Sequence, residues 1–297
     1  MTLTLFSAPL ASPPLSPVPL SSTLKSLLLM ATVAVTLTGC NRDEEKAAAP
    51  VAAPTTVAAA PAAAAAPFEF KSETPYAKVE LNLPHEIKGQ PELHAQLYAA
   101  AVKELRQFME GAQADRTEAG GDQGVPAYDA QIGFDTPVET GKLFSIARSD
   151  YEFTGGAHGN TSSAGVMWDK ALKKAIAPTS LLRPGVTLAA LDDLLCTAVN
   201  VEKKKRDPEA ETLTLAGKTN DDLWGCPHAA DTAVVLASST VPGKAGGLLF
   251  LIGPYEAGPY AEGSSEVAVP QAAIRALLAP AYADEFAGTP VVPVPAN

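Results

Sequence analysis

Apolar and polar side chains follow several distinct periods after residue 67. Residues 68–83 alternate, which predicts one or two half-buried strands. Residues 91–111 instead carry an apolar stripe with a helical period, and Pro91 suits the first helical turn while Gly111 suits the end. Alternation then returns in three runs that predict further strands: 128–140, 142–153 and 162–170.

The second part of the chain again combines predicted strands with single predicted helices. Thr187 can cap a helix with its own apolar stripe. Strands are expected at residues 230–238 and 246–252, a short third strand at 267–269, and Pro270 opens a last helix.

The order of these elements predicts the fold class. Antiparallel clusters of strands interrupted by single helices indicate an α+β fold and not alternating βαβ units. We expect two adjoining halves, residues 68–180 and 181–290, each made of antiparallel strands packed with one or two helices.

Residues 1–39 have the pattern of a secretory signal. An apolar run at residues 26–37 follows Lys25 and is too short to span a bilayer. The run leads into Leu37-Thr38-Gly39-Cys40, which looks like a bacterial lipobox in which Cys40 receives lipid. A buried cysteine after an ordinary cleavage site is the alternative. Asn41 follows the cysteine and favours the outer membrane, so we predict a lipid-anchored, periplasm-facing envelope protein.

Residues 40–67 are rich in alanine and proline and carry almost no bulky side chain. Such a segment buries too little apolar surface to offset the entropy of ordering, so it predicts a flexible tether.

The charge of the chain narrows its partners. Removing Lys25 with the signal leaves 21 basic and 33 acidic side chains, a net charge of −12. This surface repels nucleic acid and anionic headgroups, so membrane contact is expected through the lipid anchor only, and it suits a basic partner. The basic run at residues 203–206 is expected to close a helix as a solvated face.

Two cysteines remain beside Cys40. In an oxidising compartment Cys196 and Cys226 are expected to form a disulfide. Two free buried thiols are one alternative, and a metal site that joins Cys226 to His228 is another, although the usual paired spacing is absent. We predict no metal and no cofactor.

The glycine loop, residues 150–163 with the sequence DYEFTGGAHGNTSS, is the first candidate for chemistry. Its glycines supply positive φ or a close backbone approach. His158 is interpreted as a structural histidine, a ligand contact or a general base. No nucleophile elbow or phosphate-binding lysine accompanies it.

The Pro-Tyr loop, residues 253–263, is the second candidate and follows the most apolar predicted strand. Its two Pro-Tyr steps display rigid aromatic side chains that either recognise a partner or cover the core. A glycosidase pair of carboxylates is a further alternative. The carboxylates that flank the two loops are Asp150, Glu152, Glu256 and Glu262.

The stretch YEFTGGAHGN at residues 151–160, with LLFLIGPYEAGPYAEGSSEVAVP further on, resembles a bacterial extracytoplasmic domain family of unknown function. That family is shared by the ectodomain of the RsiV anti-sigma factor and the N-terminal module of PdaC-type peptidoglycan deacetylases. The resemblance would cover residues 68–288 and implies an α+β fold in a cell-wall setting.

The resemblance also implies a role. The RsiV module binds lysozyme and thereby triggers proteolysis, and an acidic chain fits a basic muramidase. This sequence shows neither an anti-sigma segment with its transmembrane helix nor a deacetylase domain, so only binding carries over, through Tyr255, Pro259 and Tyr260 together with His158.

We therefore expect a non-catalytic binding protein that recognises a lysozyme-like muramidase or a peptidoglycan-related ligand. The alternative is a small cell-wall hydrolase that uses His158 with Asp150 or Glu256. A passive envelope spacer would neither bind nor turn over a wall component.

Overall fold

The computed structural model describes residues 65–121, 126–216 and 223–291. The predicted signal at 1–39, Cys40 and the tether up to residue 64 lie outside the described residues. Everything below concerns the compact unit formed by residues 61–297. Within its described ranges, no helix has the length and apolar character needed to cross a bilayer.

The first half is built on a six-stranded sheet whose strand order follows the chain, β1-β2-β3-β4-β5-β6. Neighbouring strands are antiparallel except β2 and β3, which run parallel because the helix α1 forms the crossover between them. The strands are β1 Glu69–Glu73, β2 Ala77–Asn82, β3 Tyr128–Glu139, β4 Leu143–Phe153, β5 Asn160–Asp169 and β6 Lys174–Ala175.

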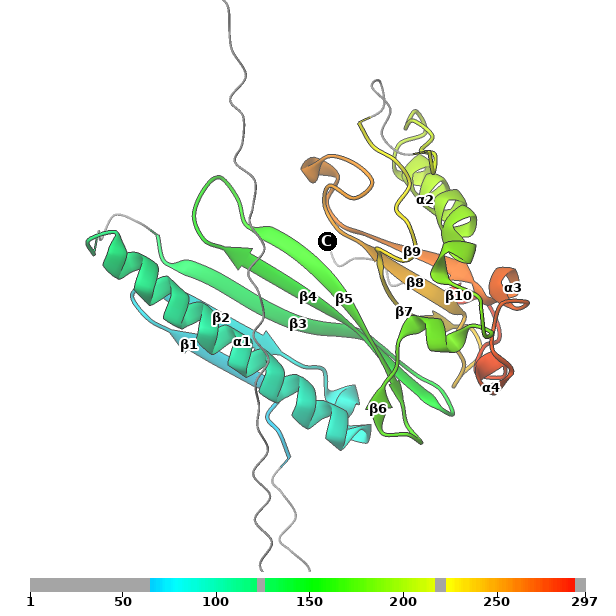
Figure 1. The fold of residues 1–297 in the computed structure, drawn as a ribbon, viewed down its shortest axis with the longest axis horizontal. Coiled ribbons are helices and arrows are strands. Elements are labelled where there is room, and N and C mark those ends of the chain that lie inside the picture. The colour runs from blue at the N-terminus through cyan, green and yellow to red at the C-terminus, as the bar shows by residue number, and fades with distance from the viewer. Residues whose placement is uncertain (1–64, 122–125, 217–222, 292–297) are drawn as a thin grey trace, which may run out of the picture. The chain divides into compact units, whose positions relative to one another are not determined.

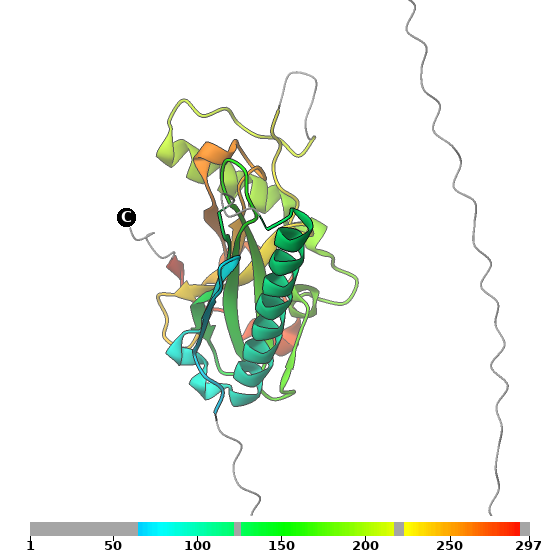
Figure 2. The same ribbon diagram turned by 90° about the vertical axis from the view of Figure 1, so that its left-hand side faces the viewer.

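Helix α1 spans Pro91–Glu118 and packs along this sheet (Figures 1 and 2). Its buried positions Leu93, Ala101 and Leu105 belong to one core with residues of β2, β3 and β4. The prediction that Gly111 ends the helix is wrong. A glycine inside a helix costs only about 1 kcal/mol. Beyond Gly111 the buried Ala112 and hydrogen bonds from the hydroxyls of Tyr76 and Tyr128 to Gln113 and Asp115 hold the last turns of the helix, which ends at Glu118.

The second half contains a four-stranded antiparallel sheet in the order β10-β7-β8-β9. Its strands are β7 Ala233–Ser239, β8 Gly247–Ile252, β9 Ser265–Pro270 and β10 Pro290–Val291. The helices here are α2 Asp192–Arg206, α3 Gln271–Ile274 and α4 Pro280–Ala283. Short 3-10 turns lie at η1 His85–Gly89 in the first half and at η2 Pro178–Leu181, η3 Leu188–Leu191 and η4 Tyr260–Glu262.

Two expected helices differ from the observed ones. Thr187 precedes the 3-10 turn η3 and makes no side-chain cap hydrogen bond, so α2 begins only at Asp192. The last predicted helix is one turn, α3, although Ile274 in it and Leu278 after it are both buried.

The two halves adjoin through their sheets, which confirms the predicted α+β fold. A Cβ atom at Gly165 of β5 would lie 2.1 Å from the carbonyl oxygen of Val234 in β7, so only glycine fits there. Beside this contact the backbone N–H of Leu236 donates to the Ser145 hydroxyl over 2.9 Å. The division of the halves at residue 180 stays a prediction.

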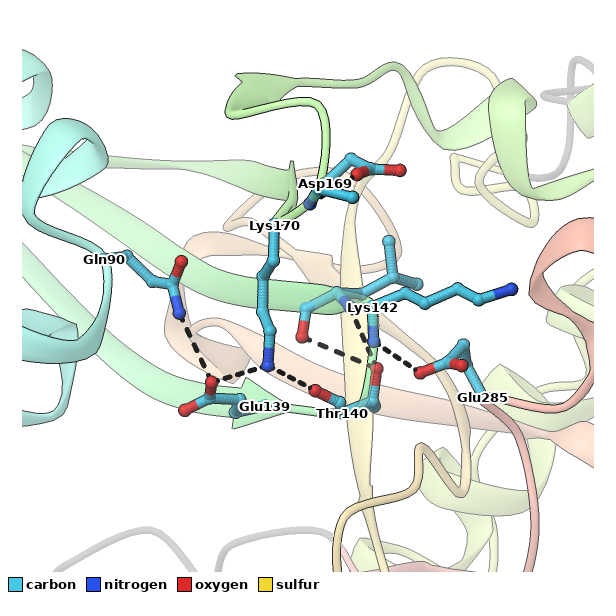
Figure 3. A network of polar contacts seen from close by, with 9 residues as sticks. Gln90, Glu139, Thr140, Lys142, Asp169, Lys170 and Glu285 are labelled. Carbon is cyan, nitrogen blue, oxygen red and sulfur yellow. Dashed lines mark hydrogen bonds and ion pairs between the residues drawn. The ribbon is translucent and has the colours of Figure 1, made fainter.

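A polar network also joins the segment after α4 to the turn between β3 and β4 (Figure 3). The buried carboxylate of Glu285 accepts the backbone N–H of Lys142 over 2.8 Å. Burial raises the pKa of Glu285, but hydrogen bonds from Thr140 and Lys142 outweigh it and bring the pKa below its ordinary value. Lys170 extends the network through Glu139 at 2.7 Å.

Candidate functional site

The glycine loop connects β4 to β5. Gly155 and Gly156 have φ of 104° and 93°, which turns the chain at the tip. Gly159 is required for space, because a Cβ atom there would lie 2.3 Å from the ring of Tyr151. The glycines therefore serve the two purposes expected of them, positive φ and close approach.

The Pro-Tyr loop leaves the end of β8 and is held by α2. Lys203 donates to the carbonyl oxygen of Ala257 over 2.9 Å and forms an ion pair with Glu262 at 2.6 Å. Gly258 leaves room for this carboxylate, since a Cβ atom would come within 2.5 Å of it. Lys203 is thus a structural anchor, and the expectation that the basic run is only a solvated face is wrong at this position.

The two loops meet at one end of the fold (Figures 1 and 2). The Tyr260 hydroxyl donates to the Gly159 carbonyl oxygen over 3.0 Å. The His158 ring stacks on Tyr260 with centroids 4.1 Å apart and an interplanar angle of 22°. Tyr255 lies 5.5 Å from Tyr260, and Trp224 lies 6.3 Å from Tyr255. We call His158, Trp224, Tyr255 and Tyr260 the aromatic surface.

Tyr255 is the most unusual residue of this surface. Its φ is 68°, a left-handed conformation that a bulky side chain adopts at a cost of about 1–3 kcal/mol. Even so, the side chain is not buried to compensate, because 50% of the residue is exposed. Residues held in such a conformation cluster at active sites, ligand clamps and switch regions. Pro259 is exposed beside it, next to Tyr260.

The carboxylates around the loops do not form a catalytic pair with His158. Asp150 binds Arg148 at 2.7 Å, and Glu262 binds Lys203. Glu256 is exposed as a residue, but neighbouring atoms partly desolvate its carboxyl group and raise its pKa, and a hydrogen bond from the Gly253 backbone opposes that rise. His158 Nδ1 lies 2.8 Å from the Gly159 carbonyl oxygen, and within the described ranges no hydrogen bond links its ring to a carboxylate.

The disulfide expected from the sequence is present. Cys196 and Cys226 are bonded with their Cα atoms 5.2 Å apart, which ties the segment that carries Trp224 to α2. His228 takes no part in a metal site with them, since its Nδ1 lies 2.8 Å from Asp192. In the part of the chain that the structure describes, no group of His, Cys, Asp and Glu side chains could hold a metal ion.

Two residues of the site were missed in the sequence. Trp224 lies two positions before Cys226, and the disulfide expected at Cys226 could have indicated from the sequence that the tryptophan side chain is held in place. Lys203 stands in a run of four basic residues, and nothing in that run distinguishes the one that is partly buried and bound to a neighbouring loop.

Residues 70–161 match the family model described as Deacetylase PdaC. The chain carries a PdaC-type segment. The match runs from β1 into β5 and takes in the glycine loop up to Thr161, so over these residues it agrees with the resemblance seen in the sequence. A PdaC-type domain is associated with the cell envelope, which supports an extracytoplasmic location for this chain.

Two solved structures resemble the chain at low identity. A member of the DUF3298 family from Bacteroides fragilis is 17% identical with a TM-score of 0.49, over 73% of this chain and 95% of that one. A DUF3298 family protein from Pseudomonas aeruginosa is 18% identical with a TM-score of 0.49, over 74% and 94%. The comparison with curated proteins found no match.

Proposed function

We propose that the protein is a lipid-anchored binding protein of the cell envelope and that the aromatic surface recognises a lysozyme-like muramidase or a peptidoglycan-related ligand without catalysis. The observation that carries the proposal is the meeting of the two loops. The His158 ring stacks on the Tyr260 ring, and the Tyr260 hydroxyl donates to the Gly159 carbonyl oxygen. Gly159 and Tyr260 are 101 positions apart in the sequence. Rigid aromatic side chains supply contact area at low entropic cost, which is why they dominate binding surfaces.

Charge supports a basic protein as the partner. The chain has a formal net charge of −11. Glu152 and Glu256 are exposed on the two loops, and no ion pair joins either of them to a cation in the described ranges. Carboxylates without an ion pair on the two loops that carry the aromatic surface complement a basic muramidase, and complementary fields raise the rate of encounter.

Calorimetric titration of the full chain with a c-type lysozyme tests the proposal. We expect measurable heat at tens of micromolar or below. Asparagine adopts the left-handed conformation readily, so Tyr255→Asn removes the ring without disturbing the loop. Loss of a central aromatic contact costs ~2 kcal/mol or more, so binding should weaken by roughly thirtyfold.

Leu172→Asn is the matched control, because Leu172 is 58% exposed and lies outside the aromatic surface. It should leave the affinity unchanged. The muramidase proposal fails if the wild-type chain gives no heat with lysozyme. A parallel titration with muropeptide fragments then decides whether the same surface binds peptidoglycan, in which case Tyr255→Asn should abolish that heat.

Lipid anchoring has a separate test. Cells that express the full chain are labelled with a palmitate analogue, and we expect label on the wild type and none on Cys40→Ser. The predicted lipobox supports this outcome. Equal labelling of both proteins would refute acylation at Cys40, and fractionation of the two membranes would test the outer-membrane location.

A further inference from the structure

A groove lies between α2 and the outer strand of the second sheet, and none of the four residues of the aromatic surface lines it. It encloses about 940 Å³. One wall is a single face of α2 that carries Leu194, Ala198 and Val201, and the other wall is the whole length of β9. Val201 is 51% exposed, so the helical wall presents apolar surface to solvent.

β9 is an edge strand. It pairs with β8 along its full length, from Ser265 to Pro270, and it stands at the end of the strand order. The backbone groups on its other edge face the groove and have no strand partner among the described residues. Six residues of strand span about 20 Å, which matches a short extended peptide. An open edge beside an apolar wall is the arrangement to which a peptide adds as a further strand.

Charged side chains of both signs line the groove, and besides the two cations named next these are Glu202 of α2 and Glu266 of β9. Lys205 and Arg206 line it at the end of α2, where Arg206 also lies with Ser265 around a smaller cavity. Lys205 is paired with Glu202 at 3.0 Å, whereas no hydrogen bond or ion pair engages the Arg206 side chain in the described ranges. The first residue of β9 thus has beside it one cation without an ion pair among the described residues, Arg206, in a chain whose net charge is −11. Pro270 at the opposite end has no backbone N–H and ends the pairing edge.

We propose that this groove binds an extended peptide segment of a partner protein, which adds to β9 as an antiparallel strand. In that direction the carboxyl end of the peptide lies beside Ser265, so acidic residues or a free C-terminus meet Lys205 and Arg206. Alternate apolar side chains of the peptide rest on Leu194, Ala198 and Val201. The proposal does not depend on the aromatic surface.

The probe is a fluorescent octapeptide of alternating threonine and valine that ends in two glutamates with a free carboxylate. Its anisotropy is followed as the full chain is added. We expect saturable binding, and a peptide that ends in two lysine amides should bind at least tenfold more weakly, because charge at the rim governs encounter and register. Two further peptides carry N-methyl groups on one set of alternate amides or the other. Only one set of alternate N–H groups points toward β9 in a paired strand. The peptide methylated on that set should lose binding, and the peptide methylated on the other set should keep it.

Arg206→Glu should weaken binding of the acidic peptide roughly tenfold. Lys204→Glu is the matched control, because Lys204 is exposed on the same helix, does not line the groove, and undergoes the same change of charge. No saturation at 1 mM peptide, equal effects of the two variants, or equal binding of both N-methylated peptides would each overturn the proposal. So would self-association of the chain that excludes the peptide, because a second copy would then be the occupant. Lysozyme binding should be unchanged in Arg206→Glu, which separates this test from that of the aromatic surface.

Discussion

The bond between Cys196 and Cys226 allows a worked prediction of stability. Its removal by Cys196→Ala together with Cys226→Ala releases a loop with a sequence separation of 30. The chain-entropy relation gives about 3.6 kcal/mol for a loop of that length, because the unfolded chain regains the freedom that the bond had removed. We therefore expect the free energy of unfolding to fall by about that amount.

The folded loop should survive this change. Asn200 Oδ1 accepts the backbone N–H of Leu213 over 2.7 Å, and its Nδ2 donates to the Leu213 carbonyl oxygen over 2.9 Å. The same Nδ2 donates to the Cys196 carbonyl oxygen over 3.0 Å. These bonds hold the loop against α2 without the disulfide, so the loss should come from the unfolded state and leave the native spectrum unchanged.

Urea unfolding followed by circular dichroism measures the effect, with and without a reductant. Reduction should destabilise the wild type as much as the double substitution does, and it should not affect the double variant. Asn200→Ala leaves two buried backbone groups of Leu213 unpaired and should cost about 1–3 kcal/mol on its own. A loss below 1 kcal/mol on removing both cysteines, or a loop that melts separately, would refute the entropic account.

Two further predictions concern packing and pH. Gly165→Ala forces a side chain against the backbone of Val234 and should lower the free energy of unfolding by about 1–3 kcal/mol in urea titrations, whereas an unchanged midpoint would show that β5 and β7 are less closely packed. The pKa of His228 is raised above 6.5, first by its hydrogen bond with Asp192 and then by the charge of that carboxylate. Its stabilising contribution is therefore complete below pH 6.5 and is lost as the pH rises through the raised folded pKa. In Asp192→Asn the side chain still accepts a hydrogen bond but carries no charge, so the free energy of unfolding, measured from pH 5 to 9, should lose the part of its pH dependence that comes from His228. An equal change of that free energy with pH in the wild type and in Asp192→Asn would contradict the assignment.

Much of the fold was readable because its signals are local. Alternation located β3 and β4 nearly to the residue, and a continuous apolar run located β8, whose residues are all buried. The parallel pairing of β2 with β3 has no such signal, because it depends on where α1 packs. Gly111 misled for a related reason, since contacts of the following turns with Tyr76 and Tyr128, which are distant in the sequence, hold the helix beyond the glycine.

The site was readable only in its parts. His158 and Tyr260 were each identified from composition, but no sequence pattern states that their rings stack. The carboxylates near His158 also looked alike in the sequence. Their partners distinguish them, because Asp150 is held by Arg148 while Glu152 stays free of ion pairs in the described ranges.

The spacing between the sheets explains how the two loops come together. Gly165 brings β5 against β7, and β7 is hydrogen-bonded to β8, whose end opens the Pro-Tyr loop. The glycine loop leads directly into β5. The contact between His158 and Tyr260 is therefore set by packing at a distance, through the missing side chain of Gly165, as well as by the loops themselves. Any substitution that separates the sheets should therefore weaken ligand binding at the aromatic surface, because it moves the His158 and Tyr260 rings apart without replacing any of the four residues.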